Sequence, residues 1–247
     1  GASTDAVDHL YVSNMASGEF EGTTGVMNAL AADLGLTPAY AQRVGQTSAS
    51  GGAGLYAAWQ SIASGASEMT LLVGGEKMTH CSTDESSDVI ASLTHPSEYS
   101  HGVTLPSLAG LTARAYLDRF DAPRESLADV AVKNHANALD NPDAQFHKEI
   151  TAAEALESPV VADPLRLYDY CPVTDGSAAL LFCPADVARE YTDEFAVLSG
   201  VAGATDTHVV HEREDPTWMG AVAESGEQAF EMADCGPADV DVAELHD

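Results

Sequence analysis

The sequence predicts an α/β protein organised around a parallel sheet. Residues 7–13 alternate between apolar and polar side chains, residues 39–46 form a second short strand pattern, and residues 69–75 form an apolar run typical of a buried strand. Helical patterns with short connections separate the three strands. Strand, helix and strand in this succession indicate βαβ units, and the 45% apolar content is enough for a buried core.

Two helices are predicted between these strands. The first lies near residues 25–35, and Gly35 ends it. In the second, Leu55, Trp59 and Ile62 recur at i, i+4 and i+7, which places them on one face of a helix.

Residues 76–165 differ from the rest and read as a mostly helical insertion, with helices at 107–120 and 125–138. The α/β pattern then resumes with a strand at 176–183, a helix at 185–191, a strand at 195–201, a helix at 218–233 and a strand at 240–245. Strand, helix and strand therefore recur on both sides of the insertion, and a duplicated α/β half would account for this.

The charge of the chain is strongly negative, with 39 Asp and Glu against 10 Lys and Arg and a net charge of -29. Such a chain repels nucleic acid and anionic membrane surfaces, so neither is expected as a partner. No apolar run reaches the roughly 18 residues of a membrane-spanning helix. The acids are scattered and form no block, which favours a solvated acidic coat suited to high salt over an acidic interaction tail.

The four cysteines are widely spaced and form no C-x-x-C pair, so a zinc ribbon within this chain is not expected. The histidines show no i, i+4 pair around a Glu, and no metal site is predicted. The first residues lack the basic and apolar regions of a signal peptide, so we expect a cytoplasmic protein with free thiols.

The most informative segment is the turn 46–52, between a predicted strand and a predicted helix. Such a turn presents a side chain at the carboxyl end of the sheet and at the positive end of the helix dipole. The small residues Gly51 and Gly52 would let a substrate approach the backbone. The alternative is that Ser50 caps the helix and the glycines only permit close packing.

Several segments resemble, in order along almost the whole chain, the motifs of thiolases. They are Ser48-Ala49-Ser50-Gly51-Gly52, where the family has its Cys-Ala-Ser-Gly nucleophile turn; residues 69–78, a strand that includes Gly75; His101 to Pro106, similar to the start of the first loop-domain helix; Asp175-Gly176; and Glu244-Leu245-His246-Asp247. The last motif is that of the archaeal and sterol-carrier-type branch.

The resemblance implies the five-layered α-β-α-β-α thiolase fold, with two duplicated α/β halves and a mostly helical loop domain that holds coenzyme A. It assigns residues 1–80 and 166–185 to the N-terminal half, 81–165 to the loop domain, and 186–247 to the beginning of the C-terminal half. The family's Gly-His-Pro and Cys-Gly-Gly segments do not occur in the sequence. We therefore expect a fragment with an incomplete active site.

The resemblance also implies two-step acyl transfer between coenzyme A thioesters, which are substrates, so no separate cofactor is expected. Ser48 takes the nucleophile position and its N–H the first oxyanion hole, and His246 takes the enolate oxyanion hole. His101, Gly51 and Gly75 are implied in substrate binding. Position 48 departs from the family because it holds Ser where the family has Cys. A hydroxyl needs an adjacent general base, so a lineage that uses Ser with His, a non-catalytic homologue and an engineered change all stay open.

Two functions follow from the resemblance. One is a β-ketothiolase of a halophilic archaeon, and the other is a non-catalytic thiolase-fold subunit that binds acyl-CoA or a partner protein. The resemblance further implies a homodimer through the strand at 39–46, with pairs of dimers, and a small OB-fold subunit with a zinc ribbon as a separate chain. Three arginines, Arg114, Arg119 and Arg124, would either contact coenzyme A phosphates or form ion pairs at the surface, and we favour ion pairs.

The charge predicts salt dependence. Because the carboxylates repel one another when they are unscreened, we expect the thermal midpoint of unfolding to fall sharply as KCl drops well below molar. Circular dichroism melts across a KCl series measure this. A midpoint that stays flat from molar to millimolar KCl would contradict the prediction.

Overall fold

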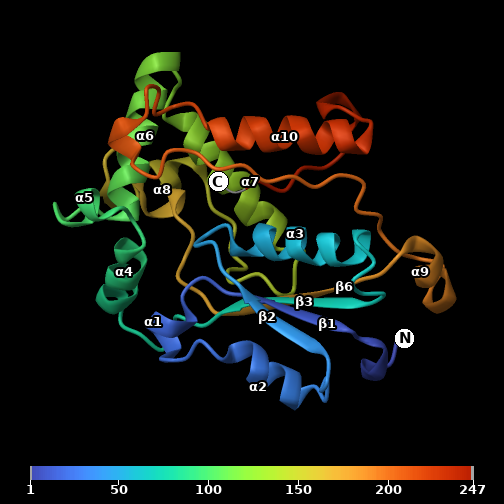
Figure 1. Cartoon of the computed structure of the whole chain (residues 1–247). Coiled ribbons are helices and arrows are strands. Elements are labelled where there is room, and N and C mark those ends of the chain that lie inside the picture. Colours follow the sequence, from blue (N-terminus) through green and yellow to red (C-terminus); the bar gives the residue numbers. More distant parts are fainter. Residues whose placement is uncertain (1, 246–247) are drawn as a thin grey trace. The chain divides into compact units, whose positions relative to one another are not determined.

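The computed structural model describes residues 2–245 and divides into two compact units, which we describe separately (Figure 1). Unit 1 comprises Gly1–Lys77, Asp175–Asp206 and Met219–Asp247. Unit 2 comprises Met78–Thr174 and Thr207–Trp218.

Unit 1 contains a four-stranded sheet in the order β2-β1-β3-β6, formed by β1 (His9–Ser13), β2 (Tyr40–Val44), β3 (Thr70–Glu76) and β6 (Gly176–Phe182). The first three strands are parallel, as predicted. The fourth runs antiparallel to β3, and Gly176 lies opposite Glu76. The chain re-enters the sheet at the end where β3 finishes, with the first residue of β6 opposite the last residue of β3, and β6 therefore runs in the reverse direction.

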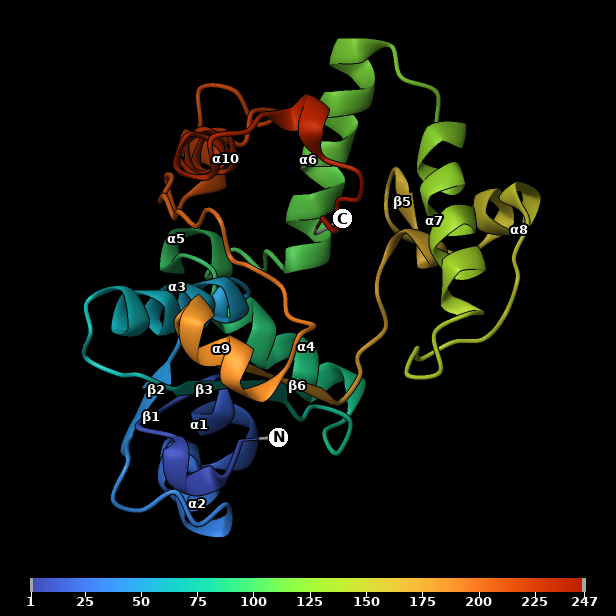
Figure 2. The same cartoon turned by 90° about the vertical axis from the view of Figure 1, so that its right-hand side faces the viewer.

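Helices cover both faces of this sheet (Figure 2). On one face α2 (Val26–Asp33) packs on Leu10 and Val12 of β1. On the other face α3 (Ser50–Ala63) packs on Tyr11. Successive residues of a strand point to opposite faces, so the alternation in β1 supplies both halves of the core. A short helix, α1 (Ser17–Glu21), follows β1 directly.

Gly54 sets how closely α3 approaches the sheet. A Cβ added at this buried glycine would lie 1.8 Å from Ser13 Oγ and 2.8 Å from Leu72 Cδ1. Those distances leave no room for a methyl group, so the absence of a side chain lets the helix pack directly on β1 and β3.

Unit 2 is mostly helical, as predicted. It contains α4 (Thr83–Ser92), α5 (Pro96–Tyr99), α6 (Leu105–Phe120), α7 (Glu125–Ala138), α8 (Ala152–Glu157) and an antiparallel pair, β4 (Val160–Ala162) and β5 (Leu165–Arg166). Capping boxes begin three of these helices, at Ser82 with Glu85, Thr104 with Ser107, and Thr151 with Glu154. No helix among the described residues is long and apolar enough to span a membrane.

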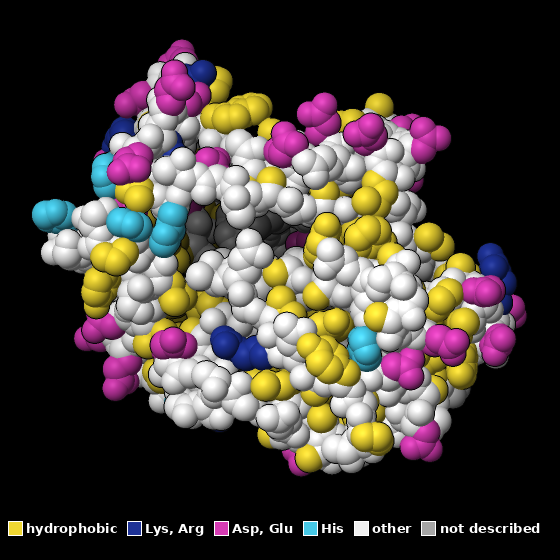
Figure 3. Space-filling view, viewed as in Figure 1, with side chains coloured by type: hydrophobic (Ala, Val, Ile, Leu, Met, Phe, Trp, Pro, Cys, Tyr) yellow, Lys and Arg dark blue, Asp and Glu magenta, His cyan; other side chains and the backbone are white. Residues whose placement is uncertain are grey.

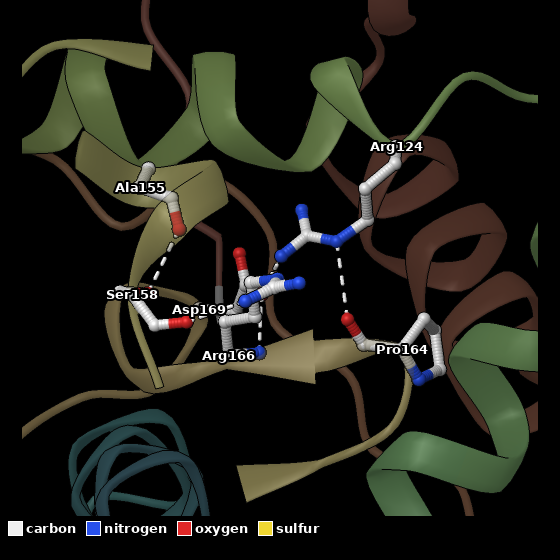
Figure 4. Close-up of polar contacts among 6 residues, drawn as sticks. All are labelled: Arg124, Ala155, Ser158, Pro164, Arg166 and Asp169. Atoms are coloured by element: carbon white, nitrogen blue, oxygen red, sulfur yellow. Dashed lines mark hydrogen bonds and ion pairs between the residues drawn. The ribbon is translucent and has the colours of Figure 1, made fainter. Parts of the chain in front are cut away.

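A half-buried charge network holds together the part of unit 2 around β5 (Figure 4). Arg124 forms an ion pair with Asp169 and donates a hydrogen bond to the carbonyl of Pro164 at 3.1 Å. Asp169 also accepts a hydrogen bond from the Arg166 amide at 2.7 Å, and the Arg166 guanidinium donates to the Ser158 carbonyl at 2.6 Å. The network joins the start of α7, the end of α8 and β5.

The three arginines singled out in the sequence all form ion pairs in unit 2. Their partners are aspartates: Arg114 pairs with Asp163, Arg119 with Asp215 and Arg124 with Asp169. The expectation of ion pairs is confirmed.

The chain after β6 forms two of the four predicted elements. The helices α9 (Ala185–Tyr191) and α10 (Gly220–Ala233) are present. The strands predicted at 195–201 and 240–245 are not formed, and those predictions are wrong. A strand needs a neighbour to pair its backbone groups, and within residues 2–245 neither segment has one. Segment 195–201 instead lies against α10, where Gly200 approaches Ala229.

We predict that Gly54→Ala lowers the free energy of unfolding by about 1–3 kcal/mol, because the methyl group overlaps Ser13 and forces α3 off the sheet. Gly52→Ala in the same helix is the control. No atom lies within 4 Å of a Cβ at Gly52, so this change should be neutral or stabilise by up to about 1 kcal/mol. Urea unfolding curves measure both, and equal stability of the two variants would contradict the packing role of Gly54.

Candidate functional site

The carboxyl ends of the three parallel strands of unit 1 meet at one edge of the sheet. Ser13 ends β1 opposite Val44, the last residue of β2, and Gly74 of β3. The turn from β2 to α3 therefore lies where the sequence predicted it, at the edge where open α/β sheets place their ligands. Ser48 lies on this turn and is exposed.

Ser50 holds the turn from inside. Its buried hydroxyl donates a hydrogen bond to the Thr47 carbonyl at 2.6 Å and accepts one from the Gln46 amide at 2.9 Å. The residue that precedes α3 is Ala49, which makes no side-chain capping bond. The alternative in which Ser50 caps the helix is therefore wrong.

The glycines at the start of α3 face open space. No atom lies within 4 Å of a Cβ placed at Gly51 or Gly52, so close packing does not account for them. Their N–H groups have no acceptor among the described residues. Free N–H groups at the positive end of a 14-residue helix favour negative charge nearby.

Thr47 carries backbone strain directly before Ser48. Its φ of 45° lies in the left-handed region, which is unfavourable for a side chain branched at Cβ. Such a conformation costs about 1–3 kcal/mol and persists only where the surroundings fix it. The Ser50 hydroxyl, bonded to the Thr47 carbonyl, is the contact that fixes it here.

The Ser48 hydroxyl has no hydrogen-bond partner among the described residues. The described part of unit 1 contains one histidine, His9, at the opposite end of β1. The Nδ1 atom of His9 lies 2.6 Å from the Ser61 hydroxyl, so this histidine is engaged away from the turn. No imidazole of the described part of unit 1 is therefore placed to activate Ser48.

A polar network ties the ends of β1 and β3 beside the turn, and sequence reasoning missed it. The Glu76 carboxylate accepts hydrogen bonds from the Met15 amide at 2.7 Å and from Asn14 Nδ2 at 2.8 Å. Asn14 Nδ2 also donates to the Gly75 carbonyl at 2.8 Å. Arg43 donates to the carbonyls of Asn14 and Met15, both at 3.2 Å. The signal in the sequence was a polar residue where each buried strand ends.

Gly75 has a structural reason of its own. A Cβ at this position would lie 3.2 Å from Ser177 Cβ, so the glycine lets β6 pair closely with β3. Its contact with substrate stays a prediction. His246 lies outside the described residues. His101 belongs to unit 2 and its amide donates to the Glu98 carbonyl at 3.0 Å.

Unit 2 has a cavity of its own, of about 560 Å³, which His101 lines together with Glu98 and His211. Glu98 is 5% exposed, and its Oε1 accepts hydrogen bonds from His211 Nδ1 at 3.1 Å and from the His211 amide at 3.2 Å. Burial alone would raise the pKa of Glu98, but the hydrogen bonds from His211 outweigh burial and lower it.

The four cysteines of the chain lie outside the turn 46–52. All four are free thiols, as predicted. Burial, followed by the nearby Asp186, raises the pKa of Cys183, so this thiol stays protonated and unreactive at neutral pH. No cluster of metal-ligating side chains occurs among residues 2–245.

Two family descriptions match the chain. "Thiolase, N-terminal domain" matches residues 1–186, and "Thiolase C-terminal domain-like" matches residues 202–247. The chain is 40% identical over 241 residues to an acetyl-CoA acetyltransferase of Methanothermobacter thermautotrophicus, which covers 98% of this chain and 63% of that protein. It is 38% identical over 243 residues to the acetyl-CoA acetyltransferase of Methanocaldococcus jannaschii, covering 98% of this chain and 62% of that protein.

Solved structures share the fold. The Ltp2-ChsH2(DUF35) aldolase superposes with a TM-score of 0.82 at 23% identity, over 97% of this chain and 62% of that one. A monomeric SCP2-thiolase like protein from Mycobacterium smegmatis gives a TM-score of 0.69 at 20% identity, over 96% of this chain and 50% of that one. The chain thus spans less than two thirds of the length of these proteins.

Alanine substitutions at the two serines of the turn should differ in their effect on stability. Ser50→Ala leaves the Thr47 carbonyl and the Gln46 amide without their partner, so the free energy of unfolding should fall by about 1–3 kcal/mol. Ser48→Ala removes an exposed, unpaired hydroxyl and should change it by less than about 0.5 kcal/mol. Urea unfolding of both variants tests this, and a Ser48→Ala loss as large as that of Ser50→Ala would refute it.

Proposed function

Because the chain belongs to the thiolase family, we propose that it forms or cleaves 3-ketoacyl-CoA by acyl transfer, with Ser48 as the group that carries the acyl chain. The observation that carries this proposal is the geometry of the turn. Ser48 is exposed and unpaired, it follows a strained residue, and it lies at the positive end of α3. The acetyl-CoA acetyltransferases that resemble the chain support the same activity.

In the first step, the Ser48 oxygen attacks the thioester carbonyl. A carbon–oxygen bond forms, the carbon–sulfur bond breaks, the serine proton passes to a general base, and coenzyme A leaves as the thiol after protonation. Negative charge develops on the carbonyl oxygen, and N–H donors stabilise it. The Ser48 amide is the proposed donor, and the dipole of α3 adds to its effect.

In the second step of synthesis, a second acyl-CoA gives up a proton from the carbon beside its carbonyl to a general base, and the resulting enolate attacks the acyl group on Ser48. A carbon–carbon bond forms, the carbon–oxygen bond to Ser48 breaks, and the serine oxygen takes back a proton from the base of the first step. We assign the enolate oxygen to His246 and further substrate contacts to His101, Gly51 and Gly75. The assignment of Gly51 is supported by the open space beside it, since no atom lies within 4 Å of a Cβ placed there.

The proposed domains follow the family. Residues 1–80 and 166–185 are the N-terminal half, 81–165 the loop domain for coenzyme A, and 186–247 the start of the C-terminal half. We also propose a homodimer through β2, or a pair of such dimers. β2 supports this because it is an edge strand, and Tyr40 at its start is 51% exposed.

A small OB-fold subunit with a zinc ribbon is a further proposed partner. The name of one structural neighbour, an aldolase with a DUF35 component, supports a second subunit. A cytoplasmic, halophilic setting is proposed on the acidic composition, and Figure 3 shows Asp and Glu spread over the visible face with few Lys and Arg among them.

The competing proposal is a non-catalytic thiolase-fold subunit that binds acyl-CoA or a partner protein. Two observations favour it: position 48 holds Ser where the family has Cys, and the described part of unit 1 places no imidazole beside Ser48.

Ser48 distinguishes the two functions. We expect Ser48→Ala to abolish condensation of acetyl-CoA and Ser48→Cys to keep or raise it, because a thiol ionises more readily than a hydroxyl while the backbone of the turn is unchanged. The measurement is intact-protein mass spectrometry of the full-length protein after incubation with acetyl-CoA in molar KCl, combined with a condensation assay of the same protein.

The matched control is Ser64→Ala, at the other end of α3, which should retain full activity. An acetyl adduct on Ser48 that Ser48→Ala lacks supports acyl transfer. A folded wild-type protein with neither adduct nor turnover supports the non-catalytic subunit, and a Ser48→Ala variant with most of the wild-type rate would show that another group is the nucleophile.

A further inference from the structure

The cavity of unit 2 has the size and the walls of a small-molecule site. Its volume of about 560 Å³ lies within the usual range for ligand pockets, roughly 300–1,000 Å³. One part of its wall is apolar and consists of Val103, Leu108, Leu111, Val210 and Pro216. Leu111 is 65% exposed, so the apolar wall is open to an arriving ligand.

Three basic side chains also line the cavity. His101, His211 and Arg213 line the cavity, and Glu98 is the acid among the lining residues. Acids outnumber Lys, Arg and His together in this chain, with 39 acids against 10 Lys and Arg and 9 His, so a lining with three such basic side chains and one acid departs from the composition. Figure 3 shows histidine side chains gathered in the region of α5.

Glu98 holds His211 in place by hydrogen bonds. Its Oε1 accepts from both the amide and Nδ1 of His211, and its Oε2 is buried without a partner among the described residues. The two hydrogen bonds from His211 therefore satisfy one oxygen of this buried carboxylate. The contact uses Nδ1, so Nε2 of the half-exposed ring stays available to a ligand.

Arg213 has donors that the protein does not use. Its Nε is buried and has no partner among the described residues. Its guanidinium donates a 3.4 Å hydrogen bond to the Thr207 carbonyl and pairs with no carboxylate in the described part of unit 2. Arg114, Arg119 and Arg124 each pair with an aspartate, and Arg213 differs from these three in having no such partner among the described residues of unit 2.

We propose that this cavity binds a short-chain carboxylate, with the alkyl chain on the apolar wall and the carboxylate on Arg213, His211 and His101. A cation is disfavoured because the single acid of the lining is already engaged by His211. A neutral apolar ligand would use none of the terminal guanidinium donors of Arg213, whereas a carboxylate accepts hydrogen bonds from them. Glu98 is then a positioning residue, which orients His211 through two hydrogen bonds.

Isothermal titration calorimetry of the whole chain tests the proposal with three ligands of equal length: hexanoate, hexanol and hexylammonium. KCl is held at the lowest concentration at which circular dichroism shows the folded chain. We expect hexanoate to bind at least about tenfold more tightly than the other two, which corresponds to about 1.4 kcal/mol. Equal binding of hexanol, preference for hexylammonium, or no heat from hexanoate up to about 10 mM would overturn it.

Variants locate the site. Arg213→Gln and His211→Gln should each weaken hexanoate about tenfold and leave hexanol unchanged, and the unchanged hexanol affinity shows that the cavity is still folded. Arg114→Gln is the matched control, since Arg114 belongs to α6 and pairs with Asp163 outside the lining. Loss of hexanoate affinity in Arg114→Gln as large as in Arg213→Gln would place the ligand elsewhere.

This proposal shares His101 with the proposed acyl transfer, but the two can be tested separately. Ser48→Ala should bind hexanoate as the wild type does, because Ser48 belongs to unit 1. A protein without condensation activity can therefore still confirm the cavity, and an active protein can still refute it.

Discussion

The common ending of β1, β2 and β3 at one edge is the constraint on which the rest of unit 1 depends. Parallel pairing brings Ser13, Val44 and Gly74 side by side, so everything that follows these strands is delivered to the same edge. The β2–α3 turn, the Asn14–Glu76 network and the return of the chain into β6 are all consequences of this alignment. A shift of one residue in the register would turn the apolar side chains of β1 to the opposite faces and separate these groups.

The local sequence pattern was enough to predict the elements β1, β3 and α3. The alternation in residues 7–13 and the apolar run in 69–75 placed β1 and β3 within one or two residues, and the spacing of Leu55, Trp59 and Ile62 placed α3. The reverse direction of β6 could not be predicted in this way, because it depends on where a long insertion returns the chain. The segments 195–201 and 240–245 have strand-like sequences but no neighbouring strand, and pattern without pairing did not give strands.

The site divides in the same manner. The turn 46–52 could be predicted because small residues between a strand and a helix form a recognisable pattern, whereas the role of Ser48 came from the family resemblance and stays a prediction. The Asn14–Glu76 network could not be predicted, because its members are 62 residues apart and meet only through the sheet. Two helices, α4 and α8, were missed although Ser82 with Glu85 and Thr151 with Glu154 have the spacing of a capping box. In those cases the signal was in the sequence and was not used.

The two serines of the turn show how the fold separates support from reactivity. Ser50 is buried and its hydroxyl bonds to the carbonyl of the strained Thr47 and to the Gln46 amide, whereas Ser48 is exposed and bonds to nothing among residues 2–245. Because the backbone of the turn is fixed from inside, the side chain at position 48 can change without a change in the turn. A family that has Cys at this position can therefore hold Ser there in the same geometry, and the difference between them lies in how readily the group gives up its proton.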